Sequence, residues 1–178
     1  PSMCDCVGYA YSCSISSNTT TFPILPTQAK STAFHGLSDK LGLNHLKKFE
    51  HLIYLDLSTG LICQIHDHTF SNQRHSQYLS LHSNCIREVR KNTFLGLESL
   101  KHLVLSYNNI SYFGKGSFDH LTSLQVAECD HNEIASIREY IFVNANNLKN
   151  LDLSHNRITT INNYHFVGLS SLKILKLY

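Results

Sequence analysis

The chain has 178 residues, of which 42% are hydrophobic and 16% charged, and its net charge at pH 7 is +2. These values fit one folded globular unit and exclude a strongly basic nucleic-acid-binding protein, because no run of lysine and arginine stands out. No stretch approaches the ~18–20 consecutive apolar residues of a membrane span, and no secretory signal peptide is present.

The chain begins with three cysteines, Cys4, Cys6 and Cys13, in the pattern C-x-C-x6-C. Small caps usually need disulfides because they cannot build a large apolar core, so we expect disulfide bonding rather than three free thiols in a disordered tail. Asn18 opens an Asn-Thr-Thr glycosylation sequon, and Asn109 opens a second one, Asn-Ile-Ser. Cysteines and sequons together favour an extracellular location.

Residues 22–26, Phe-Pro-Ile-Leu-Pro, are held extended by their prolines and are predicted to add an edge strand. From residue 29 to residue 52 the pattern is loose. Phe34 and Leu37 are expected to start a degenerate first repeat, because they lie 23 residues before Leu57 and Gly60. The apolar residues that follow are spaced as on a helix and predict its irregular or helical outer side.

From Leu52 onward the chain repeats one pattern every 24 residues without insertion, and this period indicates a solenoid. The pattern is L-x-x-L-x-L-x-x-N-x-I-x-x-I-x-x-x-x-F-x-x-L, as in residues 148–169. Its columns are, for phenylalanine, Phe70, Phe94, Phe118, Phe142 and Phe166, and, for asparagine, Asn84, Asn108, Asn132 and Asn156, with Gly60 in the first repeat.

Each column has a physical role. The two central leucines of L-x-x-L-x-L point inward from a short strand, and the residues between them point outward. The isoleucines fill the layer behind the strand, and the phenylalanines pack the convex back. The asparagine ends the strand, and its amide is expected to hydrogen-bond backbone groups of the next turn that would otherwise be buried without partners.

Departures from the pattern are local. Ser76 replaces the leading leucine of its repeat, so residues 72–75 are expected to form a loosely packed convex loop. Cys129 stands at a leucine position and is expected to be a small buried core residue. Cys63 and Cys85 follow adjacent strands at non-equivalent positions, which leaves open whether they form a disulfide or remain two thiols.

No residues form a catalytic motif: there is no serine nucleophile elbow, no phosphate-binding loop and no His-Glu-x-x-His. His66 and His68 are interpreted as a solvated loop because no further ligand has structural zinc spacing with them. His131 and His155 share a column and should stack, with Glu128, Asp130 and Asp152 on the same face. A cation-binding or pH-responsive patch is one interpretation of this group, and a protein-binding surface is the one we favour. We expect no enzyme activity, no metal and no cofactor.

The outward strand positions form the default binding site of such an array, a rigid concave face. This candidate ligand-binding surface is mixed and polar, with tyrosines that suit protein contacts. Its members are Tyr54, Asp56, Tyr78, Ser80, His82, His102, Val104, Tyr107, Val126, Glu128, Asp130, His131, Asn150, Asp152 and His155.

The cysteine pattern and the repeat together resemble the 24-residue class of extracellular leucine-rich repeat proteins, which includes Toll-like receptors, variable lymphocyte receptors, small proteoglycans and guidance ligands. The resemblance covers the cap to Pro26 and the repeats from Leu52 to Tyr178. It implies an α/β leucine-rich repeat solenoid with a curved parallel sheet, an irregular or 3-10 convex side and a cysteine cap. The full cap motif, C-x3-C-x-C-x6-C, implies a Cys4–Cys13 disulfide, and a cysteine before Pro1 as the partner of Cys6.

We therefore expect a cap over residues 1–28 and about six to seven repeats over residues 29–178. The array stops in mid-strand, so we expect a C-terminally truncated part of a longer ectodomain. The resemblance implies a ligand-binding receptor ectodomain in innate immunity, with a weak preference for the Toll-like class. The alternative is a secreted matrix or adhesion protein. The expected partner is a protein or microbial product, with a homodimer left open, no nucleic acid, and membrane attachment only through a region outside this chain.

Overall fold

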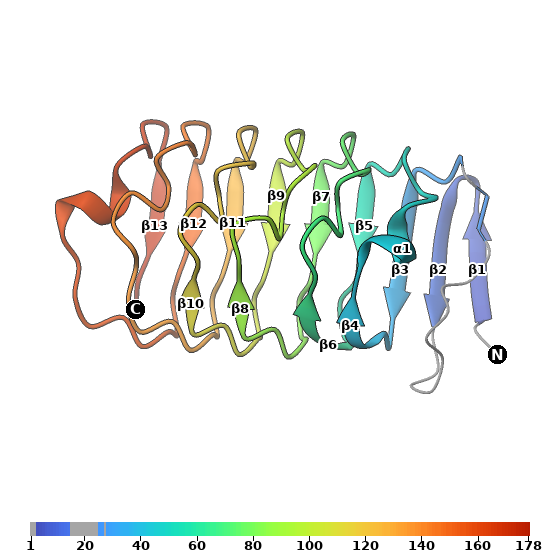
Figure 1. The fold of residues 1–178 in the computed structure, drawn as a ribbon, viewed down its shortest axis with the longest axis horizontal. Coiled ribbons are helices and arrows are strands. Elements are labelled where there is room, and N and C mark those ends of the chain that lie inside the picture. Colours follow the sequence, from blue (N-terminus) through green and yellow to red (C-terminus); the bar gives the residue numbers. More distant parts are fainter. Residues whose placement is uncertain (1–2, 15–24, 27) are drawn as a thin grey trace.

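The computed structural model describes residues 3–14, 25–26 and 28–178, and it shows a solenoid in which each repeat makes one turn (Figure 1). One long sheet forms one side of the turns. Its strands are β1 (Met3–Val7), β2 (Ala10–Ser14), β3 (Ser31–His35), β5 (Tyr54–Asp56), β7 (Tyr78–Ser80), β9 (His102–Val104), β11 (Val126–Glu128), β12 (Asn150–Asp152) and β13 (Ile174–Lys176).

The opposite side contains short elements joined by turns. They are β4 (Ser38–Leu41), α1 (Leu43–Leu46), β6 (Leu61–Ile65), β8 (Glu88–Val89), β10 (Tyr112–Phe113) and the 3-10 helix η1 (Asn163–Phe166). β4 pairs with β6 and β8 with β10, both in parallel. The helical spacing after residue 41 therefore yields only one helical turn, and the expected irregular outer side is confirmed.

The nine-stranded sheet runs through both the cap and the repeats. β1 and β2 form an antiparallel hairpin, and every later neighbour, from β2 with β3 to β12 with β13, is parallel. In the repeats the register steps by 24 residues, as in Leu55 to Leu79 to Leu103. β3 aligns Ser31 with Tyr54, which places Phe34 and Leu37 in the columns of Leu57 and Gly60 and confirms the degenerate first repeat.

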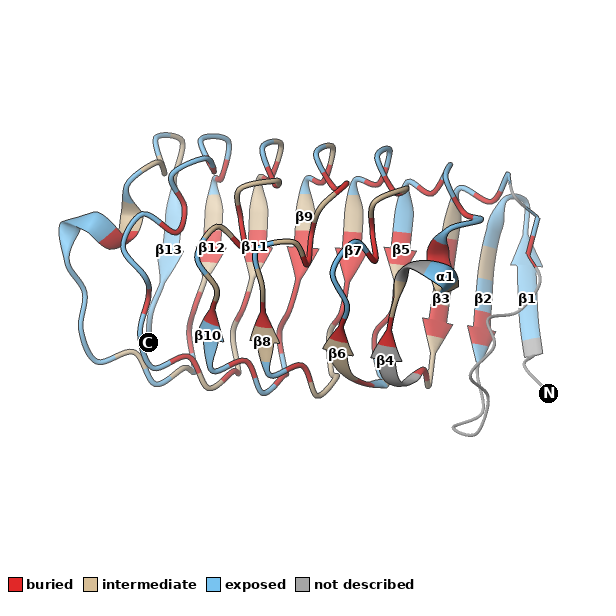
Figure 2. Ribbon diagram, in the orientation of Figure 1, coloured by how far each residue is buried: buried red, intermediate tan, exposed pale blue. Residues whose placement is uncertain are grey.

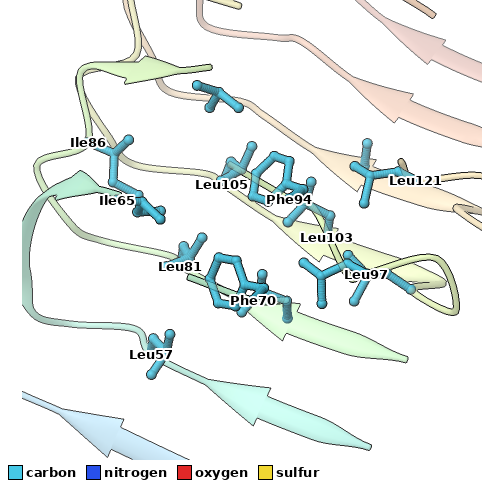
Figure 3. Close-up of a cluster of buried hydrophobic side chains, with 14 of the residues drawn as sticks. Leu57, Ile65, Phe70, Leu81, Ile86, Phe94, Leu97, Leu103, Leu105 and Leu121 are labelled. Atoms are coloured by element: carbon cyan, nitrogen blue, oxygen red, sulfur yellow. The ribbon is translucent and has the colours of Figure 1, made fainter. Parts of the chain in front are cut away.

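The interior is built from the predicted columns (Figure 2). Phe70, Phe94 and Phe142 are 0% exposed and Phe118 is 1% exposed, and leucines of adjacent strands pack beside them (Figure 3). Each layer is buried by the turns on both sides, so the last strand differs: Leu175 and Leu177 are each 37% exposed, whereas Leu151 and Leu153 are each 1% exposed. Burial between neighbouring turns is what stabilises such an array.

The asparagine column hydrogen-bonds backbone groups, but mainly in the direction opposite to the one expected. Asn132 Oδ1 accepts the N–H of Ile110 at 2.9 Å, and its Nδ2 donates to the Leu105 carbonyl at 3.0 Å. Both partners lie in the preceding turn, and only Cys129 and Asp130 are bonded within the same turn. The prediction of bonds to the next turn is wrong, because the amide points back under the strand that came before.

The cysteines divide into three kinds. Cys4 and Cys13 form a disulfide, as the family resemblance implied, and Cys63 and Cys85 form a second one. Cys6 is a free, exposed thiol. Cys129 is free and fully buried, in agreement with its predicted place in the core, and burial raises the pKa of its thiol.

The loose convex loop predicted at residues 72–75 is a correction. Gln73 is 0% exposed and its Nε2 donates to the Leu46 carbonyl at 2.9 Å, while Ser76 Oγ donates to the Leu52 carbonyl at 2.9 Å. Polar side chains replace leucines here and bond carbonyls of the preceding turn, so the loop is packed. The edge strand predicted at residues 22–26 falls mostly outside the described residues, and Leu25 and Pro26 are not in a strand.

Candidate ligand-binding surface

The outward side chains of the sheet, together with the residues just after each strand, form one surface, which we call the sheet face. Strand pairing brings the predicted residues into straight columns. The first column reads Tyr54, Tyr78, His102, Val126, Asn150, and the second reads Asp56, Ser80, Val104, Glu128, Asp152. His82 and Asp130 follow the strands, and Tyr107, His131 and His155 come one residue later.

Aromatic rings fill the first half of the first column. The rings of Tyr54 and Tyr78 stack with centroids 4.2 Å apart and planes at 6°, and His102 meets Tyr78 edge-on at 5.2 Å. Burial, together with hydrogen bonding by Tyr54, raises the pKa of Tyr78 to about 12. This phenol therefore stays neutral, and Tyr54, which is 37% exposed, presents the open end of the stack.

Carboxylates occupy the second half of the sheet face. Glu128 Oε1 lies 2.6 Å from His102 Nε2, and Asp130 Oδ2 lies 2.8 Å from His131 Nδ1. Asp152 Oδ2 accepts from Lys176 Nζ at 2.8 Å. Burial raises the pKa of Asp152, but the hydrogen bonds from Lys176 and from Ser154 outweigh it and hold the pKa below its usual range.

A second row of rings follows the strand ends. Tyr107 and His131 stack with centroids 4.1 Å apart, and His131 and His155, as predicted, are neighbours at 4.2 Å. Tyr107, His131 and His155 have φ values of 58°, 52° and 52°, in the left-handed region. Thr59 and Ser83, in the same column, share this conformation, so it belongs to the repeat rather than to a site.

Two predicted members do not reach the surface. Ser80 is 4% exposed and Val104 is 7% exposed. Both are short side chains on central strands, flanked on both sides by strands about 4.8 Å away, so longer neighbours cover them. They are removed from the candidate surface. The other thirteen predicted members are half-buried or exposed.

The sheet face is acidic although the whole chain is weakly basic. Its columns contain Asp56, Glu128, Asp130 and Asp152, and Lys176 is the cation in register with them. Sequence reasoning missed Lys176, although it lies 24 residues after Asp152 and the period could have indicated it. Buried Ser106 and Ser154 donate to Asp130 and Asp152 at 2.5 Å each, so the serines orient these carboxylates.

Other predicted sites lie away from this surface. His66 and His68 are exposed, and nowhere in the described residues do three or more His, Cys, Asp or Glu side chains gather closely enough to hold a metal ion. Asn109 and Ser111 of the second sequon are exposed, with Asn109 Nδ2 donating to Glu133 at 3.3 Å. Asn18 lies outside the described residues. Within the described part, no helix is long and apolar enough to cross a membrane.

Comparison with known proteins agrees with this architecture. A leucine rich repeat family model matches residues 50–103, 74–126 and 129–178, which together make up most of the chain. The chain therefore belongs to the leucine-rich repeat family, whose domains generally bind proteins and are typically not catalytic. A search of curated proteins found no match.

Proposed function

We propose that this chain is a non-enzymatic, ligand-binding part of an extracellular leucine-rich repeat receptor, acting in innate immune recognition. The ligand is a protein or a microbial product, and the sheet face binds it. The observation that carries the proposal is the ordered row of rings and carboxylates on that face. Tyr54, Tyr107, Glu128 and Asp152 all project from backbone held in register by strand pairing or by the bonds between turns.

Such a surface is suited to recognition because little conformational freedom remains to be lost. Tyrosine offers a large contact area with few rotatable bonds. The carboxylates are already oriented by Ser106, Ser154 and the histidines, so a partner meets preformed acceptors. Rigid preorganised groups of this kind favour specific binding over catalysis.

The extracellular part of the proposal is supported by the cap. A disulfide-bonded cap is typical of proteins that fold in an oxidising compartment. The exposed sequon at Asn109 is also compatible with glycosylation. A secreted matrix or adhesion protein is the second candidate, because the same fold and cap serve both classes.

The test of the sheet face is a binding screen. The chain, presented as a multimer, is assayed against a panel of secreted proteins, cell-surface ectodomains and microbial products. The variant Glu128→Lys with Asp152→Lys reverses two charges on the sheet face, and we expect it to weaken binding to each specific partner at least tenfold. Its thermal unfolding should stay close to that of the unmodified chain.

The matched control is Glu98→Lys with Glu139→Lys, which makes the same charge change at exposed positions outside the sheet face. Binding that survives the sheet-face variant but not the control would place the site on another surface. The full parent reading frame separates the two candidates. A membrane span and signalling domain after Tyr178 indicate a receptor, and a C-terminal cap followed by a stop codon indicates a secreted protein.

A further inference from the structure

A row of side chains along the edge where the sheet strands begin takes no part in the sheet face. Each comes from the residue just before a strand, and we call them the flank row. The members are Lys30, Ile53, Gln77, Lys101, Gln125, Lys149 and Lys173. The carbonyl of each accepts the N–H of the next, at 2.7, 2.8, 2.9, 2.9, 2.8 and 2.7 Å in turn. This unbroken chain of bonds fixes the spacing at about 4.8 Å per strand.

The flank row is cationic and contains no carboxylate. Lys30, Lys101, Lys149 and Lys173 are all exposed. Lys101 Nζ donates to Gln77 Oε1 and Lys149 Nζ to Gln125 Oε1, both at 3.0 Å. A neutral glutamine holds each ammonium group in place without cancelling its charge, so each stays available to an anion.

A groove opens at the N-terminal end of this row. It has a volume of about 460 Å³ and is lined by Lys30, His51, Ile53, His75 and Gln77, among others, with no carboxylate. A second hollow of about 320 Å³ shares His51 and His75 and adds Arg74. Glu50 lies in that second hollow, where its Oε1 already accepts Asn72 Nδ2 at 3.2 Å. The two hollows offer hydrogen-bond donors beside unpaired cations.

We propose that the flank row and this groove bind a linear sulfated polysaccharide. Sulfate groups are permanently charged and occur at intervals along such a chain, and the row offers ammonium groups about one, two and three strand spacings apart, or roughly 5, 10 and 14 Å. The site lies on a different surface from the proposed sheet-face function, and the acidic sheet face would repel the same polymer.

A single-stranded nucleic acid fits less well. Proteins that bind single strands combine a basic groove with aromatic side chains on which bases stack. The flank row contains lysine, glutamine and isoleucine, and the rings of Tyr54, Tyr78 and Tyr107 lie on the sheet face instead. Positive charge at regular intervals without a stacking surface favours the sulfated sugar.

The test uses immobilised heparin as the probe and measures binding of the intact chain by surface plasmon resonance. Lys101→Gln with Lys149→Gln should lower the affinity about tenfold and reduce its salt dependence, because two charge contacts are lost. The control is Lys91→Gln with Lys115→Gln, which removes two exposed lysines outside the row and should change the affinity less than about twofold. Thermal unfolding of both variants checks that they fold.

Four results would overturn the proposal. The unmodified chain may show no heparin binding, or both variants may lose affinity equally, which would indicate net charge alone. Desulfated heparin may bind as tightly as heparin. A single-stranded oligonucleotide may bind more tightly than heparin and lose affinity in the flank-row variant, which would make the ligand a nucleic acid. Because the charges of the sheet face are intact in these variants, none of these results bears on the sheet-face proposal.

Discussion

A single asparagine side chain in each turn joins backbone segments of two neighbouring turns. Asn132 is 7% exposed, and its amide has four backbone partners: the N–H of Ile110 and the carbonyls of Leu105, Cys129 and Asp130. Asparagine suits this position because it carries both donor and acceptor on a short side chain. The same arrangement recurs at Asn84, Asn108 and Asn156.

Asn132→Ala should therefore destabilise the chain. The substitution leaves buried backbone groups without partners, and each such group costs about 1–3 kcal/mol, so we expect a loss of about 3 kcal/mol. Urea unfolding followed by far-ultraviolet circular dichroism measures it. Asn146→Ala, at an exposed position, should change the free energy of unfolding by less than about 0.5 kcal/mol. Equal effects at the two positions would contradict the role assigned to the column.

At the scale of elements, strands of neighbouring turns are linked covalently as well as by hydrogen bonds. The Cys63–Cys85 disulfide joins β6 to the segment that follows β7, across 22 residues of sequence. The Ile62 carbonyl also accepts the Cys85 N–H at 3.1 Å, so the backbones are already adjacent. The bond therefore acts mainly by restricting the unfolded chain.

Cys63→Ser with Cys85→Ser should lower the free energy of unfolding by about 3 kcal/mol, the loop-entropy value for a closed loop of this length. The measurement is urea unfolding under non-reducing conditions. Dithiothreitol should then destabilise the unmodified chain more than the variant, which keeps the Cys4–Cys13 disulfide. A variant as stable as the unmodified chain would show that the disulfide is not formed or does not contribute.

At the scale of the whole molecule, stability is a sum over contacts between neighbouring turns. Phe118 has turns on both sides: its ring centroid lies 5.0 Å from that of Phe142, and it is 1% exposed. Phe166, in the same column, is only partly buried. The position of a turn in the array therefore decides how much a given side chain contributes.

Phe118→Ala should cost about 3–5 kcal/mol, as for other fully buried aromatic residues. Phe166→Ala removes the same atoms from a less buried position and should cost less than half as much. Chemical denaturation of the two variants, compared at matched conditions, provides the measurement. Equal costs would show that burial by neighbouring turns does not set the contribution.

The 24-residue period alone predicted which strands pair, in what register, and which columns are buried, including the placement of Phe34 in the first repeat. Parallel stacking at a constant period leaves only one register that buries every leucine, isoleucine and phenylalanine column, so a one-dimensional pattern is enough. Tyr54, Tyr78 and His102 were likewise placed in one column before any coordinates were considered.

Other features depend on distances between side chains in adjacent turns, and only the tertiary structure decided them. Cys63 and Cys85 pair although their positions in the repeat differ, and Gln73 is buried because carbonyls of the preceding turn receive its amide. Ser80 and Val104 point outward yet are covered, because their side chains are shorter than those around them. The period specifies which way a side chain points, but its reach and its neighbours determine whether it is exposed and what it contacts.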